Sequence, residues 1–280
     1  MVFKTAIFVN PNSGRLSWEK KLGRAEKAAE RLKQIFWYEG EVEVEVFREP
    51  TRSRGEFQNL LEEESRGRDC AIIGSGDGGF SDGLNHIDRN CILGYLPLGS
   101  GNNTQTAFLL HRLSLGNRII ESDLIFDEVN EKKCLFIGAG LDGYMMNESD
   151  KYREKGWRGF LRYIPSAWNT FGDCKAADIE INVDGAGLEE KSAYMVYIGK
   201  HPIAAICLPL LPGAKFDDGY LHGAVFNKWY IPNLKFSGKN IDAKFSSPWY
   251  VERDGEVVGL RYGLNVRIEE KARKLLTARL

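Results

Sequence analysis

The stretch Cys70–Phe80, CAIIGSGDGGF, indicates the fold of this chain more directly than any other part of the sequence. It begins with an apolar run typical of a buried strand and passes into a glycine-rich loop. Because glycine has no Cβ, the N–H groups of such a loop can converge on an anion, and a following helix adds its positive end. A second loop, Gly99–Asn103 (GSGNN), follows the apolar run Cys91–Leu98 in the same way. The two loops therefore predict phosphate binding.

The sequence before these loops alternates strand and helix patterns. Lys4–Asn10 is an apolar run that predicts a buried strand, and Glu41–Val46 alternates glutamate with valine, which predicts a half-exposed strand. Between them, apolar residues recur at steps of three and four over Trp18–Phe36, as on one face of an amphipathic helix. This alternation predicts an α/β domain over residues 1–132, with a parallel sheet and crossover helices.

After residue 132 the pattern changes to runs typical of strands, such as Ala177–Val183 and Trp249–Arg253. One segment, Tyr152–Phe171, has helical spacing, and its aromatic and aliphatic stripe is expected to face the core. Residues 133–280 are therefore predicted to form a second, mostly antiparallel β-sandwich domain. It stays open whether the last residues pack back on the first domain. The site is expected where the two domains meet.

The composition argues against several classes of function. The formal net charge is -1 and no long run of Lys or Arg occurs, so no nucleic-acid partner is expected. The cysteines are scattered and the histidines lack ligand spacing, which indicates reduced thiols and no zinc site. The N-terminus lacks the apolar run of a signal peptide, and no stretch is long enough to span a bilayer. A soluble, cytoplasmic protein is expected.

Three further turns carry polar groups suited to phosphate chemistry. Asn10–Gly14 (NPNSG) closes the first strand with small polar donors. Asp217–Gly219 (DDG) can offer carboxylates to a hard cation, and Asp254–Glu256 (DGE) places two carboxylates in one tight turn. Asp-Gly pairs are also common in plain hairpin turns, so each turn taken alone leaves both interpretations open.

The first loop also matches the dinucleotide-binding pattern G-x-G-x-x-G through Gly74, Gly76 and Gly79. In dinucleotide-binding folds that pattern follows the first strand, and an acidic residue ends the next strand. Here the loop follows the third predicted strand, and the next one ends in Leu96–Gly99 (LPLG) without an acid. The placement therefore disfavours a dinucleotide fold. A phosphate-binding loop of the G-x-x-x-x-G-K-[ST] type is absent from the sequence.

Taken in order, these motifs resemble the diacylglycerol kinase catalytic family, which includes bacterial lipid kinases and the sphingosine and ceramide kinases. Each family motif has a counterpart in the same order: the Asn-Pro-x-Ser-Gly turn at Asn10–Gly14, the Gly-Gly-Asp-Gly-Thr loop at Ser75–Gly79, the Pro-Leu-Gly-Thr-Gly-Asn-Asp loop at Pro97–Asn103, the Gly-x-Gly-x-Asp segment at Gly138–Asp142, and the two acidic turns at Asp217–Gly219 and Asp254–Glu256. The resemblance covers nearly the whole chain. It implies the NAD-kinase/lipid-kinase type of α/β domain and an ATP-dependent kinase that phosphorylates the hydroxyl of diacylglycerol or a related sphingoid lipid.

The resemblance also implies which residues hold the cofactors ATP and magnesium. The nucleotide would be bordered by residues of the first domain: Asn10, Ser13, Gly14, Thr51, Gly74, Ser75, Gly76, Asp77, Gly78, Gly79, Phe80 and Ser100. Asp77 would help to organise the magnesium of the nucleotide. A structural magnesium in the second domain would be held by Asp218 together with Lys215 and Tyr220.

For the transfer itself, the resemblance implies that Asp254 is the general base, supported by Glu256. Such a carboxylate can take the proton of the attacking hydroxyl. Asn103 and Asp142 would lie near the substrate. The expected partner is a lipid at the membrane surface, which places the protein at the inner face of the membrane, and the sequence leaves a homodimer open.

Three positions depart from the family pattern. Ser75 replaces a glycine, Gly79 replaces a threonine whose hydroxyl would face the phosphates, and Asn103 replaces an aspartate. The sphingosine and ceramide branch also lacks that threonine and that aspartate, so diacylglycerol is not singled out as the substrate. Two alternatives stay open: an NAD kinase-like enzyme, which shares the glycine-aspartate-glycine loop, and a nucleotide- or lipid-binding homologue with weakened catalysis.

Overall fold

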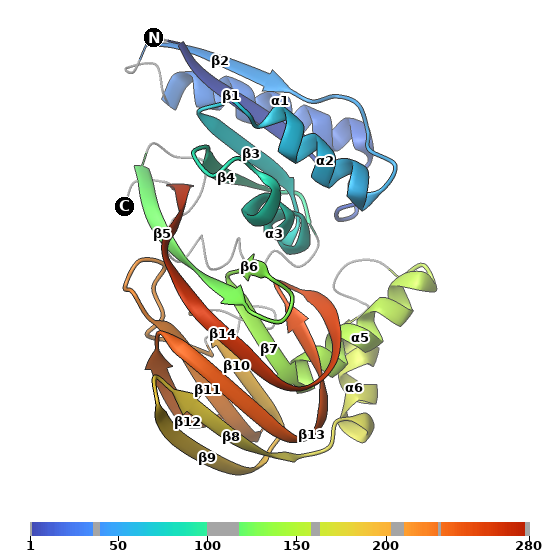
Figure 1. Cartoon of the computed structure of the whole chain (residues 1–280). Helices are drawn as coiled ribbons and strands as arrows, with labels where there is room; N and C mark the ends of the chain where they lie inside the picture. Colours follow the sequence, from blue (N-terminus) through green and yellow to red (C-terminus); the bar gives the residue numbers. More distant parts are fainter. Residues whose placement is uncertain are drawn as a thin grey trace. The chain divides into compact units, whose positions relative to one another are not determined.

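The computed structural model describes residues 2–35, 40–99, 118–157, 163–202, 210–228 and 231–277 (Figure 1). The chain divides into two compact units. Unit 1 comprises residues 1–122 and 271–280, and unit 2 comprises residues 123–270. Each unit has a hydrophobic core of its own.

Unit 1 is an α/β unit built on parallel strands. The strands are β1 (Val2–Val9), β2 (Glu41–Val46), β3 (Cys70–Ser75), β4 (Ile92–Pro97) and the end of β14 (Glu256–Thr277). They lie in the order β14-β4-β3-β1-β2, and every pair in this series is parallel. The predicted parallel sheet is confirmed. Because parallel strands need crossovers, helices separate most of these strands in the chain.

The helices of unit 1 are α1 (Trp18–Ile35), α2 (Arg54–Glu64) and α3 (Asp77–His86). α1 buries a face of small and aliphatic residues at helical spacing, which packs into the core with β1 and β3: Ala25, Ala28, Ala29 and Leu32. α2 begins at a capping arrangement, in which the Ser53 hydroxyl accepts the N–H of Glu56 and the Glu56 carboxylate accepts the N–H of Arg52. α3 starts directly from the glycine loop, with Gly76 as its N-cap.

The C-terminal end of α3 is closed by a residue from the far end of the chain. The Arg273 guanidinium is buried and donates to the carbonyls of Leu84 at 3.1 Å, Gly83 at 3.3 Å and Ile87. It also donates to the Asp88 carbonyl at 2.7 Å. A cation at the negative end of a helix satisfies carbonyls that have no partner within the helix. This contact fixes the C-terminal segment in unit 1.

Unit 2 is mostly antiparallel. Its strands are β5 (Arg118–Asp127, which starts in unit 1), β6 (Lys132–Cys134), β7 (Phe136–Gly140), β8 (Ala177–Val183), β9 (Ala186–Ala193), β10 (Met195–Gly199), β11 (Leu221–Lys228), β12 (Ile231–Gly238), β13 (Asn240–Arg253) and most of β14. The main order is β12-β11-β10-β7-β13-β14, with β8 paired to both β13 and β9. The predicted antiparallel second unit is confirmed.

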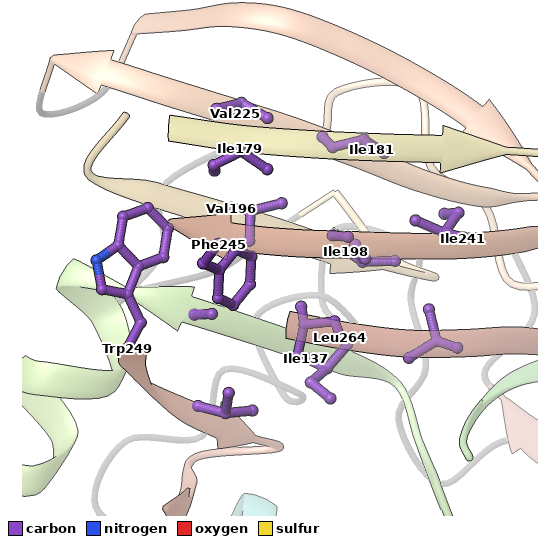
Figure 2. Close-up of a cluster of buried hydrophobic side chains, with 14 of the residues drawn as sticks. Ile137, Ile179, Ile181, Val196, Ile198, Val225, Ile241, Phe245, Trp249 and Leu264 are labelled. Atoms are coloured by element: carbon purple, nitrogen blue, oxygen red, sulfur yellow. The ribbon is translucent and has the colours of Figure 1, made fainter. Parts of the chain in front are cut away.

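The core of unit 2 is assembled from alternate residues of several strands. Figure 2 shows this cluster, in which Ile179 and Ile181 of β8 gather with Val196 and Ile198 of β10. β8 has a strict alternation of buried and exposed residues, as expected for a strand with one face in the core. Trp249 anchors one end of the cluster, and its indole N–H donates to the Lys175 carbonyl at 3.0 Å.

The helical segment of unit 2 differs from the sequence-based expectation. Two helices, α5 (Leu141–Glu154) and α6 (Tyr163–Asp173), replace the single helix predicted over 152–171. The stripe expected to face the core is exposed where it is described: Trp157 by 46%, Ile164 by 58% and Trp168 by 81%. That expectation was wrong because the segment packs its opposite, polar side inward, with Ser166 and Thr170 buried.

Two smaller points concern cysteines and membrane segments. Cys70, Cys91, Cys134 and Cys174 are buried free thiols, and Cys207 lies outside the described residues. Burial raises the pKa of Cys91 and Cys174 to about 12, so these thiols stay protonated. Among the helices of the described ranges, none is both long and apolar enough to cross a membrane.

Candidate functional site

In unit 1, three strand ends bring three loops together. β1, β3 and β4 are adjacent and parallel, so their carboxyl ends lie at one edge of the sheet. The Asn10 N–H donates to the Gly74 carbonyl at 2.9 Å, which ties the first turn to the glycine loop. The N–H groups of Leu98 and Gly99 donate to the Ser75 carbonyl at 2.8 and 3.1 Å, which ties in the third loop. The motifs at Asn10–Gly14, Gly74–Gly79 and Pro97–Gly99 thus form one site.

The glycines are required by the closeness of these loops. Gly14 has φ +64°, and a Cβ there would lie 2.1 Å from the Leu98 carbonyl oxygen. A Cβ on Gly76 would lie 3.2 Å from the Cα of Gly99. Side chains at these positions would push the loops apart, so the glycines keep backbone exposed at the strand ends.

The geometry of this edge suits an anion. Gly76, the N-cap of α3, forms no side-chain hydrogen bond to the helix. The N–H groups of the first turn are therefore directed out of the loop without a capping side chain from this residue. At this edge, Ser75 Oγ at the end of β3 is buried without a hydrogen-bond partner among the described residues, and so is Thr51 Oγ1 in the segment before α2. Buried polar atoms in a native fold almost always have a partner. A bound phosphate-containing ligand would supply one.

The other residues of unit 1 that were expected to border the nucleotide hold the first turn, belong to the start of α3 or pack in the core. The Ser13 hydroxyl donates to the Asn10 carbonyl at 3.0 Å, and the Asn12 N–H donates to Asn10 Oδ1 at 2.9 Å, so the first turn is held by its own polar groups. Asp77 and Gly78 lie in the first turn of α3. The Phe80 side chain is buried edge-on against Tyr95, with ring centroids 5.0 Å apart, so it belongs to the core of unit 1.

One residue of this site was missed from the sequence. Lys21 of α1 is buried, and its ammonium donates to the carbonyls of Pro11 and Asn10. These hydrogen bonds fix the backbone of the turn that follows β1, and the ammonium places a positive charge near the ends of the strands. Its spacing within an amphipathic helix gives no signal, because lysine on such a pattern is normally exposed.

In unit 2, the Gly-x-Gly-x-Asp segment leads from β7 into α5. A Cβ on Gly138 would lie 3.3 Å from Glu252 Oε1 and 3.6 Å from Asp142 Oδ2, so glycine here makes room for two carboxyl groups. Gly140 has φ +90° and lies so close to the Tyr194 carbonyl that a Cβ would be 2.2 Å from its oxygen. This turn places Asp142 in the first turn of α5, where a carboxylate is favoured by the helix dipole.

Asp142 and Glu252 form a buried pair of carboxyl groups. Both are buried, and burial is the largest cause that raises the pKa of each. The interaction between the two carboxyls raises the pKa of Glu252 further and lowers that of Asp142, so Glu252 is the member of the pair that favours the protonated form. The other oxygen of Glu252 accepts the Gly255 N–H at 2.9 Å. Glu252 was missed from the sequence because a glutamate in a strand is usually exposed.

Asp254 lies in a two-residue hairpin turn next to this pair. Asp254 and Gly255 have φ +46° and +81°, as in the turns that suit the twist of paired strands. Asp254 is buried, and its Oδ1 accepts the N–H groups of Leu135 at 3.0 Å and Phe136 at 3.1 Å. Glu256 starts β14 opposite Arg253. The turn therefore joins three acidic groups, Asp142, Glu252 and Asp254, in one electrostatically coupled cluster.

The second acidic turn holds a lysine. Asp218 Oδ1 and the Tyr220 carbonyl both accept from the Lys200 ammonium, at 2.7 and 2.6 Å. Lys215 is exposed in the preceding loop. Within the described ranges, no cluster of three or more His, Cys, Asp or Glu side chains could hold a metal ion. The structural magnesium implied by the resemblance does not fit these residues, because an ammonium engages two of the expected ligands.

Some expected site residues lie outside the described part of the chain. Ser100 and Asn103 belong to the segment 100–117, and most of the apolar stretch after His201 belongs to the segment 203–209.

Residues 4–126 match the family model of the diacylglycerol kinase catalytic domain. With the glycine loops at the ends of parallel strands, this match defines the chain as a phosphotransferase of the kinase class. Over these residues the match confirms the resemblance to the diacylglycerol kinase catalytic family that was drawn from the motif order.

Solved structures show the same fold. A diacylglycerol kinase from Bacillus anthracis str. Sterne aligns with a TM-score of 0.72 at 16% identity, covering 98% of this chain and 97% of that chain. An NAD kinase from Archaeoglobus fulgidus in complex with ATP is less similar, with a TM-score of 0.49 at 13% identity, covering 99% of this chain and 94% of that chain. No curated protein matches the sequence significantly.

Proposed function

We propose that this protein is an ATP-dependent lipid kinase, which transfers a phosphoryl group to the hydroxyl of diacylglycerol or a related sphingoid lipid. One observation carries the proposal: within the kinase catalytic domain, three loops converge at the ends of β1, β3 and β4 around the start of α3. Phosphoryl transfer depends mainly on positioning and charge neutralisation, and backbone N–H groups at a helix start supply both.

In this proposal, the residues of unit 1 bind the nucleotide. The N–H groups of the loop Gly76–Gly79 would bind its phosphates, and the buried hydroxyls of Ser75 and Thr51 would donate to its oxygens. Asp77, in the first turn of α3, would hold the nucleotide's magnesium. When bound, the magnesium would offset negative charge on the phosphate oxygens.

The acidic cluster of unit 2 would handle the proton. The lipid oxygen would form a bond to the γ-phosphorus of ATP as the bond to the β,γ-bridging oxygen breaks, which releases ADP. The proton of the lipid hydroxyl would pass to the Asp254 carboxylate. The N–H groups of Leu135 and Phe136 orient that carboxylate through Oδ1. Asp142, paired with the protonated Glu252, would adjoin the substrate.

The lipid substrate requires a membrane surface, and exposed side chains of unit 2 support a place for it. Ile164 and Trp168 lie one helical turn apart on α6 and are both exposed, and Trp157, which follows α5, is exposed as well. Tryptophan favours the membrane–water interface because its ring is amphipathic. Lys151 and Arg153 near the end of α5 are exposed cations that suit anionic headgroups. In this proposal the enzyme acts in the cytoplasm, at the inner face of the membrane.

Phosphoryl transfer from labelled ATP tests the proposal directly. The purified full chain is incubated with γ-labelled ATP, magnesium and, separately, diacylglycerol, sphingosine, ceramide or NAD. Label is expected in a lipid product, and Asp77→Ala, measured as a folded variant, is expected to abolish transfer. Label in the NAD product alone would favour the NAD kinase-like alternative. Nucleotide binding without transfer to any acceptor would favour a homologue with weakened catalysis.

A further inference from the structure

The ammonium group of Lys200 is the centre of a closed polar cluster in unit 2. Lys200 follows β10 and is 0% exposed. Its Nζ donates to Asp218 Oδ1 at 2.7 Å, to the Tyr220 carbonyl at 2.6 Å and to Asp123 Oδ2 at 3.1 Å. An ammonium has three N–H donors, so these acceptors use all of them.

Further hydrogen bonds close the cluster around the two carboxylates. Asp123 Oδ2 also accepts the Gly219 N–H at 2.8 Å, and Asp218 Oδ2 pairs with His222 Nε2 at 2.7 Å. The backbone of the turn Asp217–Gly219 is thereby held between β10 and the start of β11.

The acceptors around Lys200 are of the kind that a hard divalent cation takes. Carboxylate and backbone carbonyl oxygens are the usual protein ligands of magnesium and calcium. Asp218 and Tyr220 are two of the three positions at which the family resemblance implies a structural magnesium. A magnesium ion would have to lie about 2.0–2.1 Å from the same oxygens, in the space that the ammonium fills.

We propose that Lys200 is a built-in cation, which takes the place of a divalent metal at the Asp217–Gly219 turn of this protein. The lysine neutralises the buried Asp123 and the partly buried Asp218, and it orders the turn without any ion from solution. Unit 2 then folds without divalent metal, and the nucleotide alone brings the metal that the reaction needs. The proposed role of Lys200 concerns the stability of the chain, so a stability measurement tests it independently of the proposed lipid kinase activity.

Thermal unfolding of the nucleotide-free full chain, with EDTA or with excess MgCl2 or CaCl2, tests the proposal. The wild-type Tm is expected to stay within about 1 °C under all three conditions, since the cation position is filled. A rise in wild-type Tm with either metal that disappears in Asp218→Asn would overturn the proposal, whatever happens to any other variant.

The variant Lys200→Ala tests whether the position can accept a metal once the lysine is gone. Removing the cation between the buried Asp123 and the partly buried Asp218 is expected to lower the Tm in EDTA by about 10 °C or more. Added CaCl2 or MgCl2 should restore part of that loss, and it should not do so in Lys200→Ala/Asp218→Asn. If Lys200→Ala does not fold in EDTA, the same recovery is measured as refolding yield with and without metal. Equal behaviour with and without metal would mean that the pocket is no cation site, which contradicts the proposal.

Discussion

The hydroxyl of Ser75 fills the space that a side chain at residue 79 would need. A Cβ built on Gly79 would lie 1.9 Å from Ser75 Oγ and 2.6 Å from Ser75 Cβ. Gly79 is an ordinary helical residue of α3, so the glycine is not required by its backbone conformation. In the family pattern, position 75 is glycine and position 79 is threonine. The two departures from that pattern are therefore one exchange, in which a side chain is moved from α3 to the end of β3.

The exchange predicts a strong coupling between the two positions. Gly79→Thr alone should destabilise the chain by about 1–3 kcal/mol, because rotating the serine hydroxyl does not remove the overlap with its Cβ. Ser75→Gly/Gly79→Thr should recover most of that loss, which corresponds to a coupling energy of about 1 kcal/mol or more. Ser75→Ala/Gly79→Thr is the control, and it should not recover because the Cβ stays. Urea unfolding of all variants measures this, and additive effects would contradict the exchange.

The same exchange predicts that Ser75 supplies the hydroxyl that threonine supplies elsewhere in the family. Ser75→Ala removes a buried hydroxyl without a described partner, so stability should hardly change. If that hydroxyl donates to the nucleotide, the KM for ATP should rise about fivefold, which corresponds to a hydrogen bond of about 1 kcal/mol. Ser81→Ala, at a buried serine of α3, is the matched control and should leave the KM unchanged. An unchanged KM in Ser75→Ala would remove Ser75 from the nucleotide site.

Asp254→Asn separates catalysis from structure at the hairpin turn. Asparagine keeps an oxygen that can accept from Leu135 and Phe136, and it tolerates the positive φ. The Tm and the Kd for ATP should therefore stay close to wild type, while kcat falls by about 10²-fold or more if the carboxylate accepts the proton. Asp254→Ala serves as contrast, since two buried N–H groups lose their acceptor at a cost of about 1–3 kcal/mol. A folded Asp254→Asn variant with wild-type kcat would exclude Asp254 as the base.

The protonated Glu252 predicts how stability depends on pH. Its pKa in the folded chain lies well above 4.5, so above that value the folded state keeps a proton that the unfolded state releases. Its contribution is fully present below the unfolded pKa and is lost as pH rises toward the folded pKa, by about 1.4 kcal/mol per pH unit. Glu252→Gln, which is neutral at every pH, should be less pH-dependent and more stable than wild type at alkaline pH. Urea unfolding across neutral and alkaline pH measures this, with the exposed Glu180→Gln as control.

The exposed face of α6 predicts a contribution to membrane binding. Trp168→Ser should weaken partitioning to vesicles of phosphatidylcholine and phosphatidylglycerol by about tenfold, since a buried large apolar side chain contributes about 1.5–3 kcal/mol. Tyr262→Ser is the matched control, because Tyr262 is also exposed, by 67%, but lies on β14. Vesicle sedimentation measures both variants. Equal loss in the two, or no loss in Trp168→Ser, would place the membrane contact elsewhere.

Much of unit 1 could be predicted from sequence because its signals are local. The period of α1, the alternation of β2 and the apolar run of β3 each follow from burial of one face of a regular element, and the elements lie where these patterns place them. Unit 2 was harder. β14 runs from Glu256 to Thr277 with many charged residues, and its pairing with β13 comes from register and the Asp254–Gly255 turn. The segment at α5 and α6 was mistaken for one helix because spacing alone does not tell which face is inward.

By itself, the sequence predicted the resemblance to a kinase family, the order of the motifs and the two types of sheet, because glycine loops and strand periodicity are local patterns of neighbouring residues. Only the tertiary structure decided what those residues contact. Lys200 and Asp218 lie 18 positions apart, and Glu252 is far in sequence from Asp142, yet each pair forms a hydrogen bond in a buried site. Burial and charge pairing of this kind depend on which strands become neighbours. The resemblance implied a metal at Asp218, and only the fold shows that the Lys200 ammonium contacts the same carboxylate.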